Sequence, residues 1–195
     1  HCKPFIDTLG LFSRSIDDLM LLRAVSVGQP EGYSQRADAP RIGVCRTQYW
    51  DRAEPCMQVA IERAATLLTE TGAPVEDVAL PNEVTEAEPH FEVLTTWEAA
   101  KVLEREARDH LDTFNPWNRE RMEFAQTLTE DRYVEAKQGL AAARASLVTL
   151  FDKVDVLLTP PRIGEAPIGI EGVRPSPFNA VWTQMYTPCV TLPLF

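Results

Sequence analysis

The chain has 195 residues, of which 45% are hydrophobic and 25% are charged, and this composition is typical of a folded globular protein. Its formal net charge of −10 repels phosphate backbones and anionic lipid surfaces, so nucleic-acid binding is disfavoured. No stretch approaches the roughly 20 apolar residues of a membrane-spanning helix, and the N-terminus lacks the layout of a signal peptide, so a soluble cytoplasmic protein is expected.

The first predicted element is a helix that begins after Ser15 and ends near Gly28. Ser15 and Asp18 have the spacing of a helix N-cap and its acidic partner. The dense apolar run at 19–22 predicts a helix that is buried on several sides. Residues 29–40 are rich in Gly, Pro, Ser and charge, which favours a surface connection.

A strand, a helix and a second strand are predicted next. Residues 41–45 have the pattern of a short buried strand, and residues 73–81 form a second strand bounded by prolines. Between them, apolar residues recur at helical spacing from Pro55 until Gly72 ends the pattern. This order indicates a β-α-β unit, in which the two strands pair in parallel.

From residue 83 to residue 151 the pattern is helical almost throughout. One helix is predicted over 93–111, followed by a break at 115–116. A second helix begins near Thr129, where acidic residues favour the positive end of the helix dipole. The two long helices are expected to pack as an antiparallel pair.

The last part of the chain alternates between strand and loop patterns. Residues 155–159 predict a buried strand, the Pro- and Gly-rich residues 160–180 an ordered but irregular loop, and residues 189–192 a final strand. Within 178–188, three large aromatic side chains are spaced by four among amide and hydroxyl groups. This segment either lines a pocket or forms one face of a short helix that packs on the core, and both interpretations stay open.

No catalytic nucleophile is predicted in this chain. Serine catalysis needs a serine on a tight loop, a base within hydrogen-bond reach and donors for the oxyanion. None of the six serines lies in a Gly-Ser-Ser-Gly loop or a G-x-S-x-G elbow. Ser15 is interpreted as a helix cap, and Lys101 and Lys137 as solvated residues on helix faces.

The cysteines show no paired spacing, which favours reduced thiols over a disulfide framework or a zinc site. They are Cys2, Cys45, Cys56 and Cys189. A cysteine–histidine pair between Cys45 or Cys56 and His90 or His110 is an alternative, although Cys45 belongs to a predicted buried strand. No spacing indicates converging carboxylates, so no metal site is predicted.

Residues 7–19 and 155–160 resemble stretches of the amidase signature family, whose members cleave carboxamides with a Ser-Ser-Lys triad. Residues 179–193 are also similar to that family, so the resemblance covers nearly the whole chain. It implies an α/β fold, in which helices cover a mixed, twisted sheet and a long helix pair lies in the middle, and it implies no cofactor. The expected organisation is one domain over 1–195 with a helical insertion at 83–151.

The resemblance also implies roles for individual residues. In the family, the nucleophile loop and the catalytic lysine lie upstream of the stretch that resembles 7–10, so no catalytic residue is expected here. Both ends are interpreted as cut from a longer chain. The residues expected to support the active site are Asp7, Thr8, Gly10 and Arg14. The residues expected to line the substrate pocket are Thr159, Pro160, Trp182 and Tyr186.

Two functional hypotheses follow. The first is the C-terminal part of an amidase that hydrolyses a small carboxamide to a carboxylate and ammonia, inactive as the isolated chain. The second is a non-enzymatic interaction module, in which the helix pair and an exposed sheet edge bind a complementary chain or a second copy. An amidotransferase-type subunit, which passes ammonia to another protein, is the alternative within the enzyme class.

Overall fold

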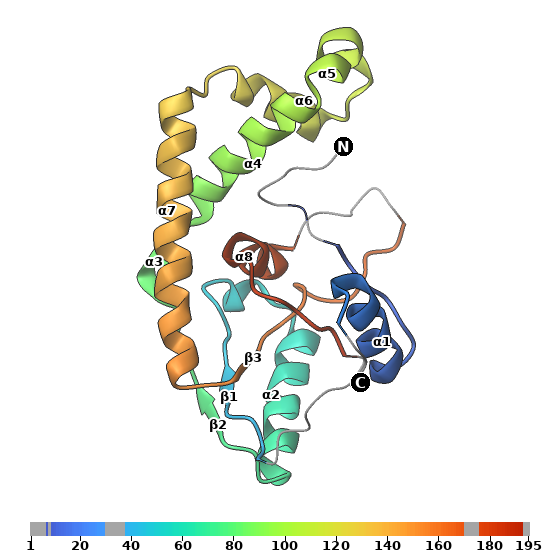
Figure 1. The fold of residues 1–195 in the computed structure, drawn as a ribbon, viewed down its shortest axis with the longest axis vertical. Coiled ribbons are helices and arrows are strands. Elements are labelled where there is room, and N and C mark those ends of the chain that lie inside the picture. Colours follow the sequence, from blue (N-terminus) through green and yellow to red (C-terminus); the bar gives the residue numbers. More distant parts are fainter. Residues whose placement is uncertain (1–6, 8, 30–37, 170–175, 193–195) are drawn as a thin grey trace.

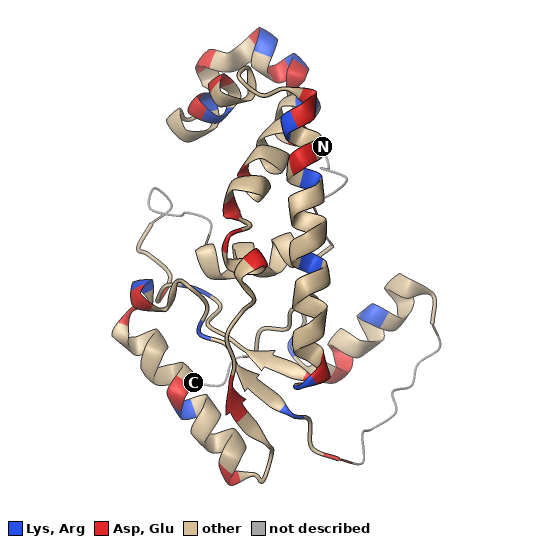
Figure 2. Cartoon of the chain, turned by 90° about the vertical axis from the view of Figure 1, so that its left-hand side faces the viewer, with Lys and Arg blue, Asp and Glu red and all other residues tan. Residues whose placement is uncertain are grey.

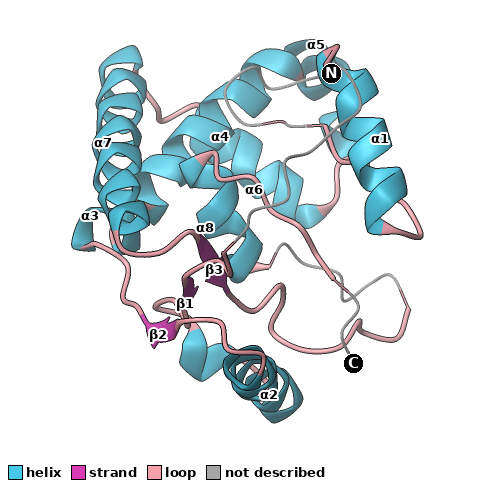
Figure 3. Cartoon of the chain, turned by 60° about the horizontal axis from the view of Figure 1, so that its bottom comes forward, coloured by secondary structure: helices cyan, strands magenta, loops and turns pink. Residues whose placement is uncertain are grey.

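A computed structural model describes residues 7, 9–29, 38–169 and 176–192 of the chain. A small three-stranded sheet lies in the lower half of the view in Figure 1, away from α4, α5 and α6. Helix α2 (Pro55–Glu70) lies on one side of this sheet, whereas α7 (Glu130–Val148) and α8 (Pro177–Met185) lie on the other (Figure 3). This arrangement confirms the predicted α/β class.

The sheet has the order β2-β1-β3, and both pairings are parallel. Strand β1 (Ile42–Val44) is central and fully buried, with β2 (Val75–Asp77) and β3 (Val156–Leu158) on its two sides. The predicted β-α-β unit is therefore confirmed as β1, α2 and β2. The Asp155 carboxylate accepts hydrogen bonds from the backbone N–H of Arg41 at 2.8 Å and from its guanidinium at 3.2 Å, which aligns the starts of β1 and β3.

Helix α1 (Ile16–Val27) has the predicted ends but not the predicted burial. The Ser15 hydroxyl accepts from the N–H of Asp18 at 3.1 Å, and Gly28 ends the helix with a φ of 64°. Only Ala24 of this helix is buried, and Val25 is 74% exposed. The dense apolar run therefore does not indicate contact with the described core, and the prediction of a buried helix is wrong.

The segment between β2 and β3 is helical, as predicted, but it contains more helices. They are α3 (Asn82–Thr85), α4 (Glu88–Val102), α5 (Glu104–His110), α6 (Pro116–Ala125) and α7, with 3-10 turns at Leu111–Thr113 and Thr149–Asp152; a further 3-10 turn at Trp50–Arg52 lies between β1 and α2. The helix predicted over 93–111 is broken at Leu103. Charged residues gather on α5 and α6 (Figure 2), and α5 has no buried residue. The helix therefore gains no packing energy from continuing beyond Leu103. Helices α4 and α7 run in opposite directions (Figure 1), as predicted.

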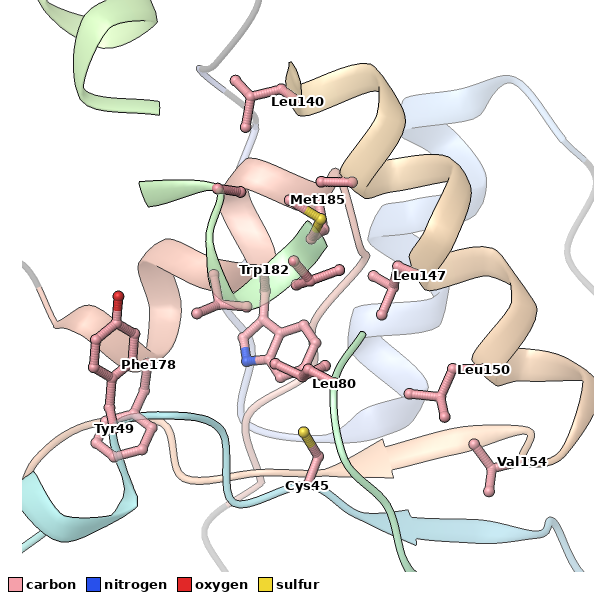
Figure 4. Close-up of a cluster of buried hydrophobic side chains, with 14 of the residues drawn as sticks. Cys45, Tyr49, Leu80, Leu140, Leu147, Leu150, Val154, Phe178, Trp182 and Met185 are labelled. Atoms are coloured by element: carbon pink, nitrogen blue, oxygen red, sulfur yellow. The ribbon is translucent and has the colours of Figure 1, made fainter. Parts of the chain in front are cut away.

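The core lies where the sheet meets α7 and α8 (Figure 4). Phe178 is fully buried and meets the Tyr49 ring edge to face, with centroids 6.3 Å apart. Residues 178–185 are thus part of a helix that packs on the core. Tyr186 lies just beyond the helix with a φ of 56° and is 46% exposed.

The strand predicted at 189–192 is absent: this segment is irregular, since no described strand pairs with it. Strands need a hydrogen-bonded neighbour, so an apolar sequence alone does not define one. None of the helices in the described ranges is both long and apolar enough to cross a bilayer.

Tyr49 should make stability depend on alkaline pH. Its hydroxyl donates to the Glu88 carboxylate at 2.9 Å, and burial together with this carboxylate raises the pKa of Tyr49 from 10.0 to about 12. The folded state therefore keeps the proton longer than the unfolded state, so the contribution of Tyr49 is present below pH 10 and is lost as pH rises towards 12. We expect the free energy of unfolding, measured by urea titration, to fall across this window. The fall should be smaller for Tyr49→Phe, and equal slopes in both proteins would contradict the assignment.

Candidate functional site

A pocket of about 320 Å³ lies beside the open edge of β3, at its carboxyl end. One wall is the face of α2 that carries Met57, Ala60, Ile61 and Ala64. These side chains are at the helical spacing of three and four that the sequence shows, so the amphipathic pattern of α2 serves both the core and this pocket.

The other walls come from three segments that are distant in sequence. Leu158 is the last residue of β3 and Thr159 and Pro161 follow it, Asn179 and Trp182 lie on α8, and the irregular segment 189–192 closes the pocket. No charged side chain is among the described residues that line it. The pocket therefore suits an uncharged group that is largely apolar.

Two polar atoms in these walls lack a partner. The hydroxyl of Thr159 and the indole Nε1 of Trp182 are buried and make no hydrogen bond within the described residues. A buried polar group without a partner costs about 1–3 kcal/mol. The indole can only donate, and the hydroxyl can donate or accept, so both could bind an acceptor oxygen such as an amide carbonyl.

The structure places two of the four predicted substrate-binding residues in this pocket. Thr159 and Trp182 line it. Pro160 is fully buried, and its neighbour Pro161 lines the pocket instead. Tyr186 is outside the pocket, with its ring stacked against the guanidinium of Arg144. A role of these four residues in substrate binding stays a prediction.

Three of the residues predicted to support the active site are described, and all three precede α1 in the sequence. Asp7, Gly10 and Arg14 are exposed and do not line the pocket, and Thr8 lies outside the described residues. Their predicted role likewise stays a prediction.

The contribution of α2 and Cys189 was not predicted from the sequence, and Asn179 was covered only by one of the two interpretations of residues 178–188. The apolar periodicity of α2 was the available signal, but it predicts only which face is covered, not that part of this face lines a pocket. Cys189 is exposed, but partial desolvation of its thiol raises its pKa, which favours the protonated form.

The cysteine–histidine alternative finds no support in the geometry. Burial raises the pKa of the Cys45 thiol to about 11, and the Cys56 thiol contacts Glu54 at 3.8 Å. The His90 ring packs against Gly139 of α7. Within the described ranges, neither thiol is hydrogen-bonded to a histidine.

Each described serine hydroxyl either makes a hydrogen bond that stabilises local structure or makes none. Ser15 caps α1, as predicted, and the Ser146 hydroxyl donates to the Glu83 carboxylate at 2.9 Å. The Ser176 hydroxyl is buried without a partner in the described part of the chain. No hydrogen bond joins any of the described serine hydroxyls to a lysine.

Comparisons with known proteins place this geometry in context. The family model described as Amidase matches residues 1–190. The chain is 30% identical to a 2-amino-5-chloromuconic acid deaminase of Comamonas testosteroni, and the match covers 97% of this chain and 44% of that protein. It is 22% identical to an amidase of Pseudomonas putida, over 80% of this chain and 36% of that protein. The chain thus spans less than half the length of these curated relatives.

Solved structures agree at the level of the fold. A crystal structure of an amidase superposes with a TM-score of 0.72 at 23% identity, covering 89% of this chain and 42% of that one. A structure described as a vestigial protein complex that reveals the origins of an s-triazine catabolic enzyme gives a TM-score of 0.52 at 26% identity. That second match covers 75% of this chain and 33% of the other chain.

Proposed function

The chain belongs to the amidase family, and we propose that it contributes the substrate pocket of an enzyme that hydrolyses a small carboxamide to a carboxylate and ammonia. The match of the family model over 1–190 carries this proposal. The pocket beside β3 supports it, because its uncharged walls include Thr159 and Trp182, whose hydroxyl and indole N–H have no partner among the described residues.

We further propose that the described residues shape the pocket but do not attack the amide bond. Nucleophilic catalysis requires a serine within reach of a base, and the described serine hydroxyls are bound to helix backbone or Glu83, or are unpartnered. The purified 195-residue chain should therefore release no ammonia from benzamide or propionamide above a protein-free control. Ammonia release is also the appropriate readout for a deaminase, the activity named for the Comamonas testosteroni relative. Turnover by the chain alone would contradict this part of the proposal.

Binding of an amide should depend on the two unpartnered polar atoms. Thr159→Val removes one of them with little change in shape, and Trp182→Phe removes the other while also making the ring smaller, so each should weaken benzamide binding about threefold to tenfold. Binding can be followed by isothermal titration calorimetry. Thr66→Val and Trp117→Phe are the matched controls, since both residues are exposed and outside the pocket. Equal affinity in all five proteins would overturn the assignment of this pocket to the amide.

The interaction module is a second candidate, which the surface of α1 supports. Leu21, Leu22, Val25 and Val27 are all exposed on this helix, and β3 leaves one edge unpaired among the described strands. Apolar faces and open strand edges of this kind promote association with another polypeptide. One of the solved structures that resemble the chain also comes from a protein complex.

Light scattering at increasing concentration tests this candidate. If α1 mediates self-association, Val25→Lys should shift the chain towards monomer, whereas Val59→Lys on α2 should not, although Val59 is also exposed. A chain that stays monomeric at every concentration would count against self-association through α1.

A further inference from the structure

Arg144 is held in a fixed position by two uncharged partners. Its Nε donates to the backbone carbonyl of Gln184 at 2.7 Å, and the guanidinium lies 3.5 Å from the centroid of the Tyr186 ring. The side chain is half-buried between α7 and the end of α8. A carbonyl and an aromatic ring orient a cation, but neither supplies a negative charge.

The positive charge of Arg144 has no counterion in the described part of the chain. This is unexpected in a protein with 29 acidic and 19 basic residues. Arg41 and Arg46, by comparison, form ion pairs with Asp155 and with Glu62 and Asp77. A half-buried cation without a counterion can bind an anion from solution.

The geometry leaves one edge of the guanidinium available. Stacking uses the face of the group, and the Gln184 carbonyl uses Nε, so the two terminal nitrogens make no hydrogen bond to described residues. This pair of nitrogens matches the two oxygens of a carboxylate.

The backbone at Tyr186 supports a built site. A non-glycine residue with a φ of 56° is strained by about 1 kcal/mol. This conformation ends α8, and the tyrosine ring lies against the guanidinium of Arg144. Asn179 and Trp182 of α8 line the apolar pocket, whereas Gln184 and Tyr186 do not, so the two sites are distinct.

From these observations we propose that Arg144, stacked on Tyr186, binds the carboxylate of a small organic acid at a site separate from the apolar pocket. A single guanidinium matches one negative charge, and the net charge of −10 opposes multiply charged anions such as phosphates. The site goes beyond amide hydrolysis, because it recognises an acid rather than an uncharged amide.

An NMR titration of the full chain with benzoate tests the proposal. The Nε–H signal of Arg144 should shift with benzoate and not with benzamide, which has the same shape without the charge. Arg144→Gln should weaken benzoate binding at least tenfold, and Arg144→Lys should weaken it less, because the charge remains while the planar fork is lost. Arg132→Gln is the matched control on the same helix, since Arg132 is exposed, and it should bind benzoate as the unmodified chain does.

The proposal is overturned if benzoate and benzamide shift the Arg144 signal equally, if neither shifts it, or if Arg132→Gln weakens binding as much as Arg144→Gln. The comparison of benzoate with benzamide on the unmodified chain tests the proposal even if Arg144→Gln fails to fold. Its outcome is independent of amide binding in the apolar pocket, so the two proposals can fail separately.

Discussion

Replacement of Phe178 by alanine is expected to lower the free energy of unfolding by about 3–5 kcal/mol. Phe178 has no exposed surface, and its ring meets the edge of Tyr49 inside the main core. The substitution removes the apolar surface of the whole ring and leaves a cavity that neighbouring helices can fill only in part.

Urea unfolding followed by circular dichroism measures this loss. Phe12→Ala is the matched control, because the same atoms are removed from a side chain that is 93% exposed. That change should alter stability by no more than about 0.5 kcal/mol. Similar losses in both variants would show that Phe178 is not part of the core described here.

Replacement of Gly43 by valine is expected to lower the free energy of unfolding by about 3 kcal/mol, which is at the upper end for overpacking a core. Gly43 lies in the middle of the central strand. A Cβ at this position would be 2.8 Å from a methyl of Val78 and 3.0 Å from a methyl of Leu157. The strand cannot move away without breaking its pairing on both sides.

A second substitution separates crowding from other effects. If Val78 causes the clash, the double variant Gly43→Val/Val78→Ala should recover part of the lost stability, as measured by urea unfolding. No recovery in the double variant would mean that the loss at Gly43 has another origin.

Local signals in the sequence were sufficient to predict the three strands of the sheet and most helix ends. Ser15, Thr129 and Gly28 act at the helix ends where their chemistry predicts, because capping depends only on neighbouring backbone groups. The strand patterns around β1, β2 and β3 predicted the β-α-β unit for a similar reason, since each short apolar run lies between clear turn residues.

The errors concern properties that depend on distant parts of the fold. The apolar residues 19–22 look like a core helix, but burial requires a surface to pack against, and the described residues provide little for α1. Residues 189–192 have the composition of a strand but no described partner. Leu103 continues the helical spacing, yet the charged residues after it find no packing and the helix breaks.

The candidate site was predictable only in part. Thr159 and Trp182, which line the pocket, were chosen because each belongs to a stretch that resembles the amidase signature family, and their role in substrate binding stays a prediction. The face of α2 could not be found in this way, since Met57 and Ile61 read as ordinary core positions and only the tertiary fold leaves space beside them. The Arg144–Tyr186 stack depends on the unusual backbone at Tyr186, which no residue pattern indicates.

The contact between Arg41 and Asp155 has a consequence for the order of folding. Its two residues are 114 positions apart, whereas β1 and β2 are joined through a single helix. Closing the longer loop costs more chain entropy, and contacts of high sequence separation slow folding. Docking of β3 onto β1 should therefore be the late, rate-limiting event in refolding. Substitutions that weaken the Arg41–Asp155 contact should mainly accelerate the detachment of β3 from the sheet.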